Sequence, residues 1–232
     1  MRKVILSAVA LMIATVGFAQ YNDSDVLQVG LLNFSDVNQD GTDNDSDVLQ
    51  IGAFNTSDVD QYGDANGSLV VQLGLGNKSK VMQIGAKNES FVLQVGEGND
   101  ANVFQLGVIN DSDIIQLGWL NDADVIQLGY DNDSDILQVG GWNKAFALQV
   151  GAWNRSTVQQ WGFDNRSTGL QFGLGNYSKV RQYGFSNRAF LLQHGIINVS
   201  DVHQHGTGHM STTIQVGVLN HSFVTQHDLG GS

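Results

Sequence analysis

Cysteine and proline are both absent from the 232 residues. Without cysteine the chain has no disulfide bonds, which excludes a small fold held together by them. Proline cannot donate to a strand ladder and is confined to sheet edges and bulges, so its absence suits strands that are paired on both sides. Basic residues are few: 11 Lys and Arg stand against 23 Asp and Glu, for a net charge of −12. This charge argues against nucleic acid as a partner.

The first 19 residues differ in composition from the rest. A basic pair, Arg2 and Lys3, precedes an almost unbroken apolar run, and the small residues Gly17 and Ala19 occupy the −3 and −1 positions of a cleavage site. This arrangement predicts a secretory signal peptide over residues 1–19. A membrane anchor is the alternative, but the apolar run is short for a span and the repeat follows it directly. We therefore predict a secreted chain.

The remainder, residues 20–232, is an eleven-residue repeat without a linker or a change in composition, and we predict a single domain. Glutamine recurs every eleven residues, and Gly stands two residues after each of these glutamines except the last, where Asp228 replaces it. Asn stands six residues before and fails only at His209, and Ser or Ala stands four before. Such strict repetition predicts stacked, equivalent units. The 19 repeated glutamines are Gln28, Gln39, Gln50, Gln61, Gln72, Gln83, Gln94, Gln105, Gln116, Gln127, Gln138, Gln149, Gln160, Gln171, Gln182, Gln193, Gln204, Gln215 and Gln226.

An eleven-residue period is compatible with a right-handed helical supercoil or with β-strands. Glycine in every unit would destabilise a helix by about 1 kcal/mol at each position. Apolar positions alternate with small or polar ones instead, and β-branched residues dominate, which is typical of strands. In a strand Asn132, Ser134, Ile136, Gln138 and Gly140 share one face. Because this face repeats in every unit, we predict that it is enclosed and that the variable face meets solvent.

The Gly-x-x-Asn segment is predicted to form the turn, because glycine tolerates positive φ and asparagine tolerates the left-handed conformation and caps its own backbone. Two arms make a strand–turn–strand layer of 22 residues. Layers about 4.8 Å apart then stack into an all-β solenoid of cross-β type. Interior Gln and Asn amides are predicted to form hydrogen-bonded ladders, and the Ser rows to do the same at smaller volume. Ladder and turn positions include Asn22, Asn33, Asn44, Asn55, Asn132, Asn143, Asn220, Gly30, Gly52, Gly140 and Gly217.

The pattern Gln-x-Gly-x-x-Asn-x5-Gln runs from Gln50 through Gly52 and Asn55 to Gln61, and it recurs across nearly all of residues 20–232. It resembles the curlin repeat of bacterial curli fibres, whose full pattern is Ser-x5-Gln-x-Gly-x-x-Asn-x5-Gln. This chain departs from it in having Ser four rather than six residues before Gln, with Asn in the curlin Ser position. Both arms of each layer also carry nearly the same pattern.

The resemblance implies a secreted amyloid subunit that polymerises outside the cell into fibres of the biofilm matrix and supports adhesion. The partners it implies are further copies of the chain, a minor nucleator curlin, and an outer-membrane secretion channel with accessory factors, reached through the periplasm. The residues support polymerisation independently. Uncapped end strands expose unpaired backbone that serves as a template for another chain, and head-to-tail addition gives a filament.

Charge is distributed unevenly over the outward positions. Acidic residues gather in the first part of the chain, while six basic residues and all six histidines lie in the part after residue 137. We hypothesise that this polarity orients assembly, with the basic and histidine-bearing end meeting the acidic start of the next copy. A solvated surface shaped by drift among duplicated units is the alternative interpretation.

The outward positions also carry two candidate metal sites. The pairs Asp111/Asp113 and Asp133/Asp135 are expected to stack one layer apart. Such like-charged rows oppose pairing and are predicted to delay polymerisation, with calcium binding as the alternative.

The second candidate is a histidine group formed by His203, His205 and His227, in a geometry that could bind Zn or Cu, although surface histidines more often bind nothing. Aromatic residues at the turns, such as Trp119 and Trp142, are predicted to line one or both edges of the stack.

Three classes of function remain after these observations. A fibre subunit is favoured, and a monomeric β-solenoid binding module, acting on polysaccharide or as a surface adhesin, is the alternative. A β-helix enzyme is disfavoured because no insertion interrupts the repeat and no Ser/His/Asp constellation or phosphate loop stands out. We therefore predict no catalytic residues, cofactor or bound metal.

Overall fold

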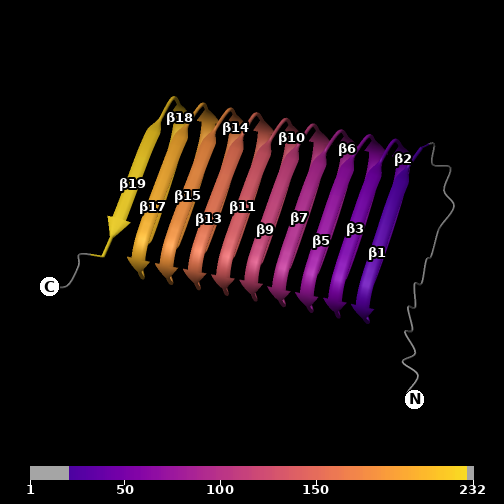
Figure 1. Cartoon of the computed structure of the whole chain (residues 1–232). Helices are drawn as coiled ribbons and strands as arrows, with labels where there is room; N and C mark the ends of the chain where they lie inside the picture. Colours follow the sequence, from indigo (N-terminus) through magenta and orange to yellow (C-terminus); the bar gives the residue numbers. More distant parts are fainter. Residues whose placement is uncertain (1–20, 229–232) are drawn as a thin grey trace, which may run out of the picture.

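The computed structural model describes residues 21–228, which form 19 β-strands joined by tight turns (Figure 1). Within these residues no helix is long and apolar enough to cross a membrane. The predicted signal peptide, residues 1–19, lies outside the described part of the chain. The strands are β1 (Asp23–Leu31), β2 (Phe34–Thr42), β3 (Asp45–Ala53), β4 (Thr56–Asp64), β5 (Gly67–Leu75), β6 (Lys78–Ala86), β7 (Glu89–Glu97), β8 (Asp100–Val108), β9 (Asp111–Trp119), β10 (Asp122–Tyr130), β11 (Asp133–Gly141), β12 (Lys144–Ala152), β13 (Arg155–Phe163), β14 (Arg166–Leu174), β15 (Tyr177–Phe185), β16 (Arg188–Ile196), β17 (Val199–Thr207), β18 (Met210–Val218) and β19 (His221–His227).

The strands form two parallel sheets that face each other. Odd-numbered strands build a ten-stranded sheet and even-numbered strands a nine-stranded sheet. Each strand pairs with the strand 22 residues further on, so that equivalent positions lie side by side, as Gln116 does with Gln138. The β-solenoid of two arms per layer that the repeat predicts is therefore confirmed.

The core is the narrow space between the two sheets. Burial alternates along the strands, and the inward positions are the Asn, Ser, Val or Ile, and Gln of each arm. Its apolar part is a single row of small aliphatic side chains in each sheet, such as Val59 and Ile114. Three of the four enclosed rows are polar or small, so hydrogen bonding inside the stack matters as much as apolar burial.

The turn differs from the predicted one. The left-handed residue is not the asparagine but the residue before it, for example Phe54 at φ 58° and Trp142 at φ 57°. Asparagine is instead buried between the sheets, where its side chain bonds to neighbouring layers. The turn backbone sets this conformation, because it bends before the asparagine and leaves that side chain pointing inward.

The repeated glycine also has a different task from the one predicted. It lies inside the strand rather than in the turn, with φ between 111° and 139° at positions from Gly30 to Gly217. A Cβ atom on Gly118 would lie 1.9 Å from the carbonyl oxygen of Gly140 in the next layer. Glycine is therefore needed both for its positive φ and because adjacent layers approach each other at this point.

Candidate functional site: the side-chain ladders and the two ends of the stack

The repeated glutamines form two continuous ladders, one in each sheet. The Gln116 Nε2 donates to the Oε1 of Gln138 at 2.9 Å and also to the carbonyl oxygen of Asp100 in the other sheet at 2.8 Å. Gln138 donates in turn to Gln160 at 2.9 Å. Each glutamine from Gln28 to Gln204 donates in this way toward the C-terminal end of the stack. The ladders therefore have a direction and join the two sheets.

The asparagines form two ladders that run the opposite way. The Asn143 Nδ2 donates to the Oδ1 of Asn121, in the layer before it, at 3.1 Å, and to the carbonyl oxygen of Gly162 at 2.9 Å. The backbone N–H of Asn143 also donates to the Asn121 oxygen, at 3.2 Å. Equivalent bonds join Asn22 to Asn44 and Asn198 to Asn220 at the two ends of the stack. Interior amides in both kinds of ladder thus have their donors and acceptors paired.

The predicted serine ladders are not present. The hydroxyl groups of the serine rows, including Ser134 and Ser156, are buried without a hydrogen-bond partner among the described residues. An amide carries its donor and acceptor on different atoms and can bridge layers about 4.8 Å apart, whereas a hydroxyl is a single atom too far from its equivalent in the next layer. The position requires a small side chain and not a hydroxyl group, which explains why Ala123 and Ala145 occupy it equally well.

The ladder directions make the two ends of the stack different. At the N-terminal end, Gln28 and Gln39 present Oε1 atoms to which no described residue donates. At the C-terminal end, Gln215 and Gln226 each donate to one backbone carbonyl, of Val199 and Met210 respectively, and retain a second N–H. The Nδ2 of Asn22 is buried without a described partner. One end therefore offers glutamine acceptors and the other offers glutamine donors.

The only two breaks in the Asn and Gly rows meet at the C-terminal end. The Nε2 atom of His209 lies 3.1 Å from Asp228 Oδ1 and 3.1 Å from the carbonyl oxygen of His205. The Asp228 carboxylate also accepts from the backbone N–H of Thr207 at 3.0 Å. This pair closes one corner of the last layer and leaves most of β18 and β19 uncovered.

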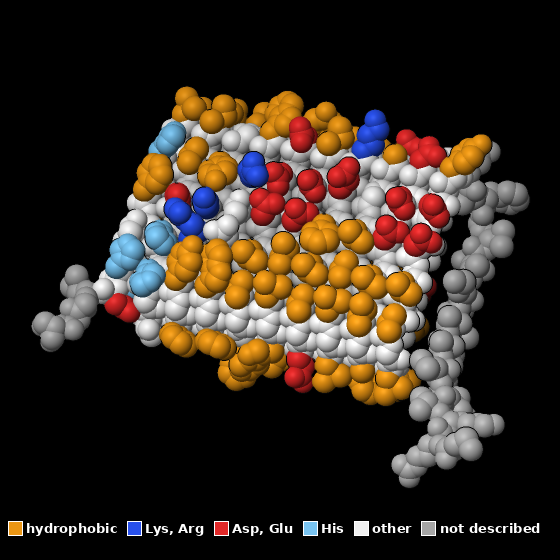
Figure 2. All heavy atoms as spheres, viewed as in Figure 1, with side chains coloured by type: hydrophobic (Ala, Val, Ile, Leu, Met, Phe, Trp, Pro, Cys, Tyr) orange, Lys and Arg blue, Asp and Glu red, His pale blue; other side chains and the backbone are white. Residues whose placement is uncertain are grey.

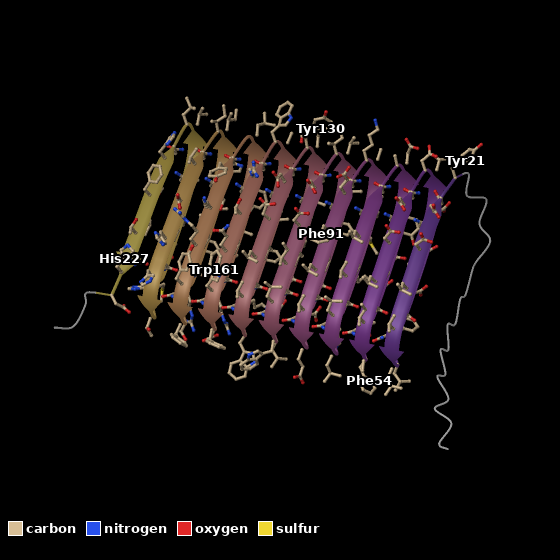
Figure 3. The ribbon with its side chains drawn as sticks, viewed as in Figure 1. Tyr21, Phe54, Phe91, Tyr130, Trp161 and His227 are labelled. Carbon is tan, nitrogen blue, oxygen red and sulfur yellow. The ribbon has the colours of Figure 1, made fainter. Side chains whose placement is uncertain are left out.

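An apolar belt two residues wide crosses the outside of the ten-stranded sheet (Figure 2). It consists of the residues that flank each ladder glutamine, such as Leu137 and Val139 beside Gln138, and adjacent layers keep it in register. Toward the C-terminal end it continues into Trp161 (Figure 3) and Tyr183, and their rings stack with centres 4.7 Å apart. Sequence reasoning missed this belt, although the signal is the apolar residue on each side of most repeated glutamines.

The acidic pairs predicted from the sequence stack as expected beside this belt. Asp111 lies next to Asp133 and Asp113 next to Asp135 in adjacent strands. Burial, together with the neighbouring carboxylates, raises the pKa of the Asp111 and Asp133 carboxyls to about 6. Arg155 ends the row on the C-terminal side with contacts of 3.2 Å to Asp133 and 3.5 Å to Asp135. The row stores like-charge repulsion at neutral pH.

The predicted histidine group is brought together at the C-terminal end. Ring centres of His203 and His205 lie 5.4 and 5.8 Å from that of His227. Burial lowers the pKa of His203, and Arg181 lowers it further. Within residues 21–228 no three His, Asp or Glu side chains are placed to hold a metal ion.

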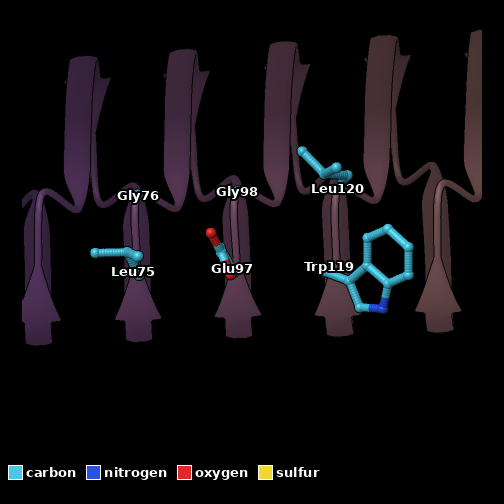
Figure 4. Close-up of a pocket in the computed structure, with 6 residues that line it drawn as sticks. All are labelled: Leu75, Gly76, Glu97, Gly98, Trp119 and Leu120. Carbon is cyan, nitrogen blue, oxygen red and sulfur yellow. The ribbon is translucent and has the colours of Figure 1, made fainter.

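The predicted aromatic residues line both turn edges. On the edge formed by turns that follow odd-numbered strands, the Trp119 ring lies 5.0 Å from Trp142 and 5.9 Å from Phe163. On the opposite edge Tyr130 lies 6.1 Å from Trp153. Where glycines replace larger turn residues, the first edge has a shallow hollow (Figure 4). It is lined by Leu75, Gly76, Glu97, Gly98, Trp119 and Leu120.

Two stretches of the chain, residues 80–107 and 129–162, match the family model described as the curlin associated repeat. Both consist of the ladder glutamines, glycines and asparagines described above, with their strands and turns. No curated protein matches the chain significantly in sequence. The family match confirms the resemblance read from the residues: both stretches carry the curlin associated repeat.

Proposed function

We propose that this chain is a secreted structural subunit that assembles head-to-tail into curli-like extracellular fibres of the biofilm matrix and supports adhesion. The observation that carries the proposal is the direction of the ladders. A C-terminal end with free glutamine N–H groups fits an N-terminal end with free glutamine oxygens, so that the glutamine bonds inside the stack have counterparts across the junction. Two like ends would set acceptor against acceptor or donor against donor.

The exposed end strands add a second reason for assembly. Parallel strands β18 and β19 each pair on one side only, as do β1 and β2. Unpaired strand edges attract further strands, and a head-to-tail contact that does not close produces a filament. Apolar side chains on these strands, among them Leu27 and Val216, are largely exposed. Joining the ends would satisfy the backbone and bury these side chains together.

The family match supports the remainder of the proposal at a coarser level. Residues 1–19 would act as the signal peptide, and export would proceed through the periplasm and an outer-membrane channel with accessory factors. A minor nucleator curlin would start the fibre, and this chain would extend it. No cofactor and no catalytic residue enters this function.

The test is assembly of the mature chain, residues 20–232, diluted from denaturant. We expect thioflavin fluorescence to rise after a lag that seeds shorten, with unbranched fibrils in electron micrographs. A soluble, β-rich monomer at high concentration would contradict the proposal and would favour the monomeric binding module.

A paired variant tests the role of the ends. Changing Gln28 and Gln39 to Met removes the acceptors of the N-terminal end but leaves the interior ladders, from Gln50 onward, in place. We expect seeded elongation to slow at least tenfold while the circular dichroism of the folded chain is retained. Gln159→Met, the same change at an outward position in the middle of the stack, is the matched control and should elongate normally. Equal rates for both variants would remove the ladders from the assembly mechanism.

A further inference from the structure

We propose that successive copies in the fibre are turned by half a rotation about the stack axis, so that the ten-stranded sheet of one copy continues the nine-stranded sheet of the previous copy. This inference rests on the proposed head-to-tail assembly and specifies its geometry. It follows from the number of described strands and from the side chains on the two end layers.

The number of strands in the described residues is odd, and this sets the geometry of the junction. Strands alternate between the two sheets, and both β1 and β19 belong to the ten-stranded sheet. Each arm rises by half a layer, because one full layer of 22 residues contains one strand of each sheet. The first strand added beyond β19 would therefore stack on β18, in the nine-stranded sheet. The second added strand, half a layer further along the stack, would stack on β19.

Only a rotated copy fills both positions in order. With half a rotation, β1 of the next copy pairs with β18 and its β2 pairs with β19, and all strands remain parallel. Without rotation, β1 would pair with β19, and β2 would lie two layers above β18. That arrangement leaves a gap one strand wide in the nine-stranded sheet, with unpaired backbone on both sides of it.

The outward side chains of β18 and β1 fit this arrangement. In register, Ile214 meets Leu27 and Val216 meets Val29, and beyond them Val218 meets Leu31. Ile214 and Val216 are 61% and 66% exposed in the single chain, and Leu27 is 58% exposed. Adjacent turn residues continue the match, since Leu219 would lie beside Leu32 of the next copy. Apolar side chains left uncovered at each end would thus be covered by those of the other end.

The second contact, between β19 and β2, pairs polar side chains on either side of the ladder glutamines. Thr225 meets Asn38, and His227 meets Asp40 of the next copy. The histidine group at the C-terminal end (Figure 3) would therefore face a carboxylate and an amide. This is the specific form of the hypothesis that the histidine-bearing end meets the acidic start of the next copy.

The unrotated arrangement would pair unlike groups. Thr225 would lie on Leu27 and His227 on Val29, while Ile214 and Val216 would border the gap without a partner. The one favourable outward pair it offers is His221 with Asp23. Both the backbone pairing and the apolar contacts therefore favour the rotated junction.

The ladders also continue across the rotated junction. Gln215 would donate to Gln28 and Gln226 to Gln39, and Asn33 would donate to the Oδ1 of Asn220. The remaining asparagine, Asn22, would meet His209. The carbonyl oxygen of His205 accepts from His209 Nε2, which holds the imidazole in place at this end.

Half-rotation has a consequence for the fibre surface. The belt of the nine-stranded sheet is polar in β2 and apolar from β6 to β18 apart from His194, whereas the belt of the ten-stranded sheet is apolar from β1 to β11. On each side of the fibre an apolar run of one copy therefore continues into that of the next. The structural repeat is two copies, about 90 Å at a layer spacing of about 4.8 Å.

Cysteine pairs introduced on separate copies test the junction, since no cysteine is present to interfere. Fibres grown from a mixture of Ile214→Cys and Leu27→Cys chains should form covalent dimers on mild oxidation, because in-register parallel neighbours lie within disulfide reach. A mixture of Thr225→Cys and Asn38→Cys chains should cross-link as well. A mixture of Thr225→Cys and Leu27→Cys chains should give less than a tenth of that yield.

The outcomes separate this inference from the proposed function. If no fibres form, the proposed function fails. If fibres form and Thr225→Cys cross-links to Leu27→Cys while Ile214→Cys does not, the half-rotation alone is wrong. A second variant lacks one arm, residues 155–165, and therefore has an even number of arms. Its end strands should stack without rotation, and its Thr225→Cys and Leu27→Cys chains should still remain uncross-linked. Electron micrographs of that variant should show an axial repeat of one copy in place of two, and an unchanged two-copy repeat would overturn the inference.

Discussion

Leu137 and Gln138 are adjacent in β11, but Leu137 lies on the outer face of the sheet and Gln138 on the inner face. Gln138 is completely buried and has glutamine in the strands on both sides of it. Leu137 is half-buried on the outer face and lies between Ile115 and Gln159. The inner row is uniform because each layer must meet an identical layer, whereas the outer row meets solvent and can vary.

The comparison reverses the arrangement of most soluble domains, which enclose large apolar side chains and expose polar ones. Here amides, hydroxyls and small aliphatic groups are inside, and Leu, Ile, Val and Trp residues cover much of the outside. Such a stack is held together by hydrogen-bond ladders and by close contact of layers at glycine. Its large apolar surface is therefore left on the outside of the stack.

Substitution of two glycines in β14 tests the constraint on the inner rows, and the largest change in stability is expected here. A Cβ on Gly173, at φ 118°, would lie 2.0 Å from the carbonyl oxygen of Gly195. We expect Gly173→Ala to lower the free energy of unfolding by about 4 kcal/mol or more, because the clash involves backbone and the substituted residue is strained. The measurement is the guanidinium midpoint followed by circular dichroism.

Gly169, four residues earlier, is the matched control. A Cβ there would lie 3.6 Å from the Ser156 hydroxyl and 3.8 Å from that of Ser178, which are ordinary contacts. We expect Gly169→Ala to raise the unfolding free energy by about 0.4–1 kcal/mol, because alanine restricts the unfolded chain. Losses of equal size in the two variants would mean that close layer contact is not what the repeated glycine provides.

The adjacent pair in β11 gives the second test. Gln138→Met keeps the length of the side chain but leaves the Gln116 donor and the Gln160 acceptor without partners. We expect a loss of about 3 kcal/mol, since unpaired buried groups bear their full desolvation cost.

Leu137→Gln is the control and should change the unfolding free energy by less than about 1 kcal/mol, because Gln159 already occupies that row in the next strand. A comparable loss from both would show that the inner and outer rows are under equal constraint.

The architecture was predictable because the repeat has no insertion: from Gln28 to Gln226 a single spacing fixes both the register and the inward face. Three features were not predictable from composition. The direction of a ladder depends on which way the amide of Gln138 or Asn143 is turned, and both orientations use the same residue. Side chains as different as those of Phe54 and Asp131 adopt the left-handed turn conformation, which is imposed by the stack and not by preference. The serine hydroxyls suggested a ladder that their length does not allow.

The acidic rows on the outer face give a third test, through pH. The pKa of Asp111 and Asp133 is about 6 in the folded chain against an ordinary value of 3.8, so the folded chain binds more protons between these values. The unfolding free energy must therefore rise as pH falls from about 7 to about 4. The variant Asp111→Asn with Asp133→Asn should be more stable than the parent near pH 7, and the difference should vanish near pH 4.

Unfolding midpoints across this pH range provide the measurement for the acidic rows. Thr157→Ala, which changes the outward neighbour of Asp135 without removing a carboxylate, serves as the control and should leave the slope between about pH 4 and 7 unchanged. A double variant with the same slope as the parent would show that these two carboxyls do not titrate in that range.

The smallest effect is expected from an inner residue, and it separates enclosure from hydrogen bonding. Ser134 is completely buried, but its hydroxyl has no partner among the described residues. Ser134→Ala removes a desolvated polar atom without breaking a bond, and Ala123 and Ala145 show that the row accepts a methyl group. We expect the unfolding free energy to remain within about 0.5 kcal/mol of the parent or to rise slightly. A loss above about 1 kcal/mol would mean that the hydroxyl is hydrogen-bonded in solution, and the inner rows would then owe their uniformity to bonding at every polar position.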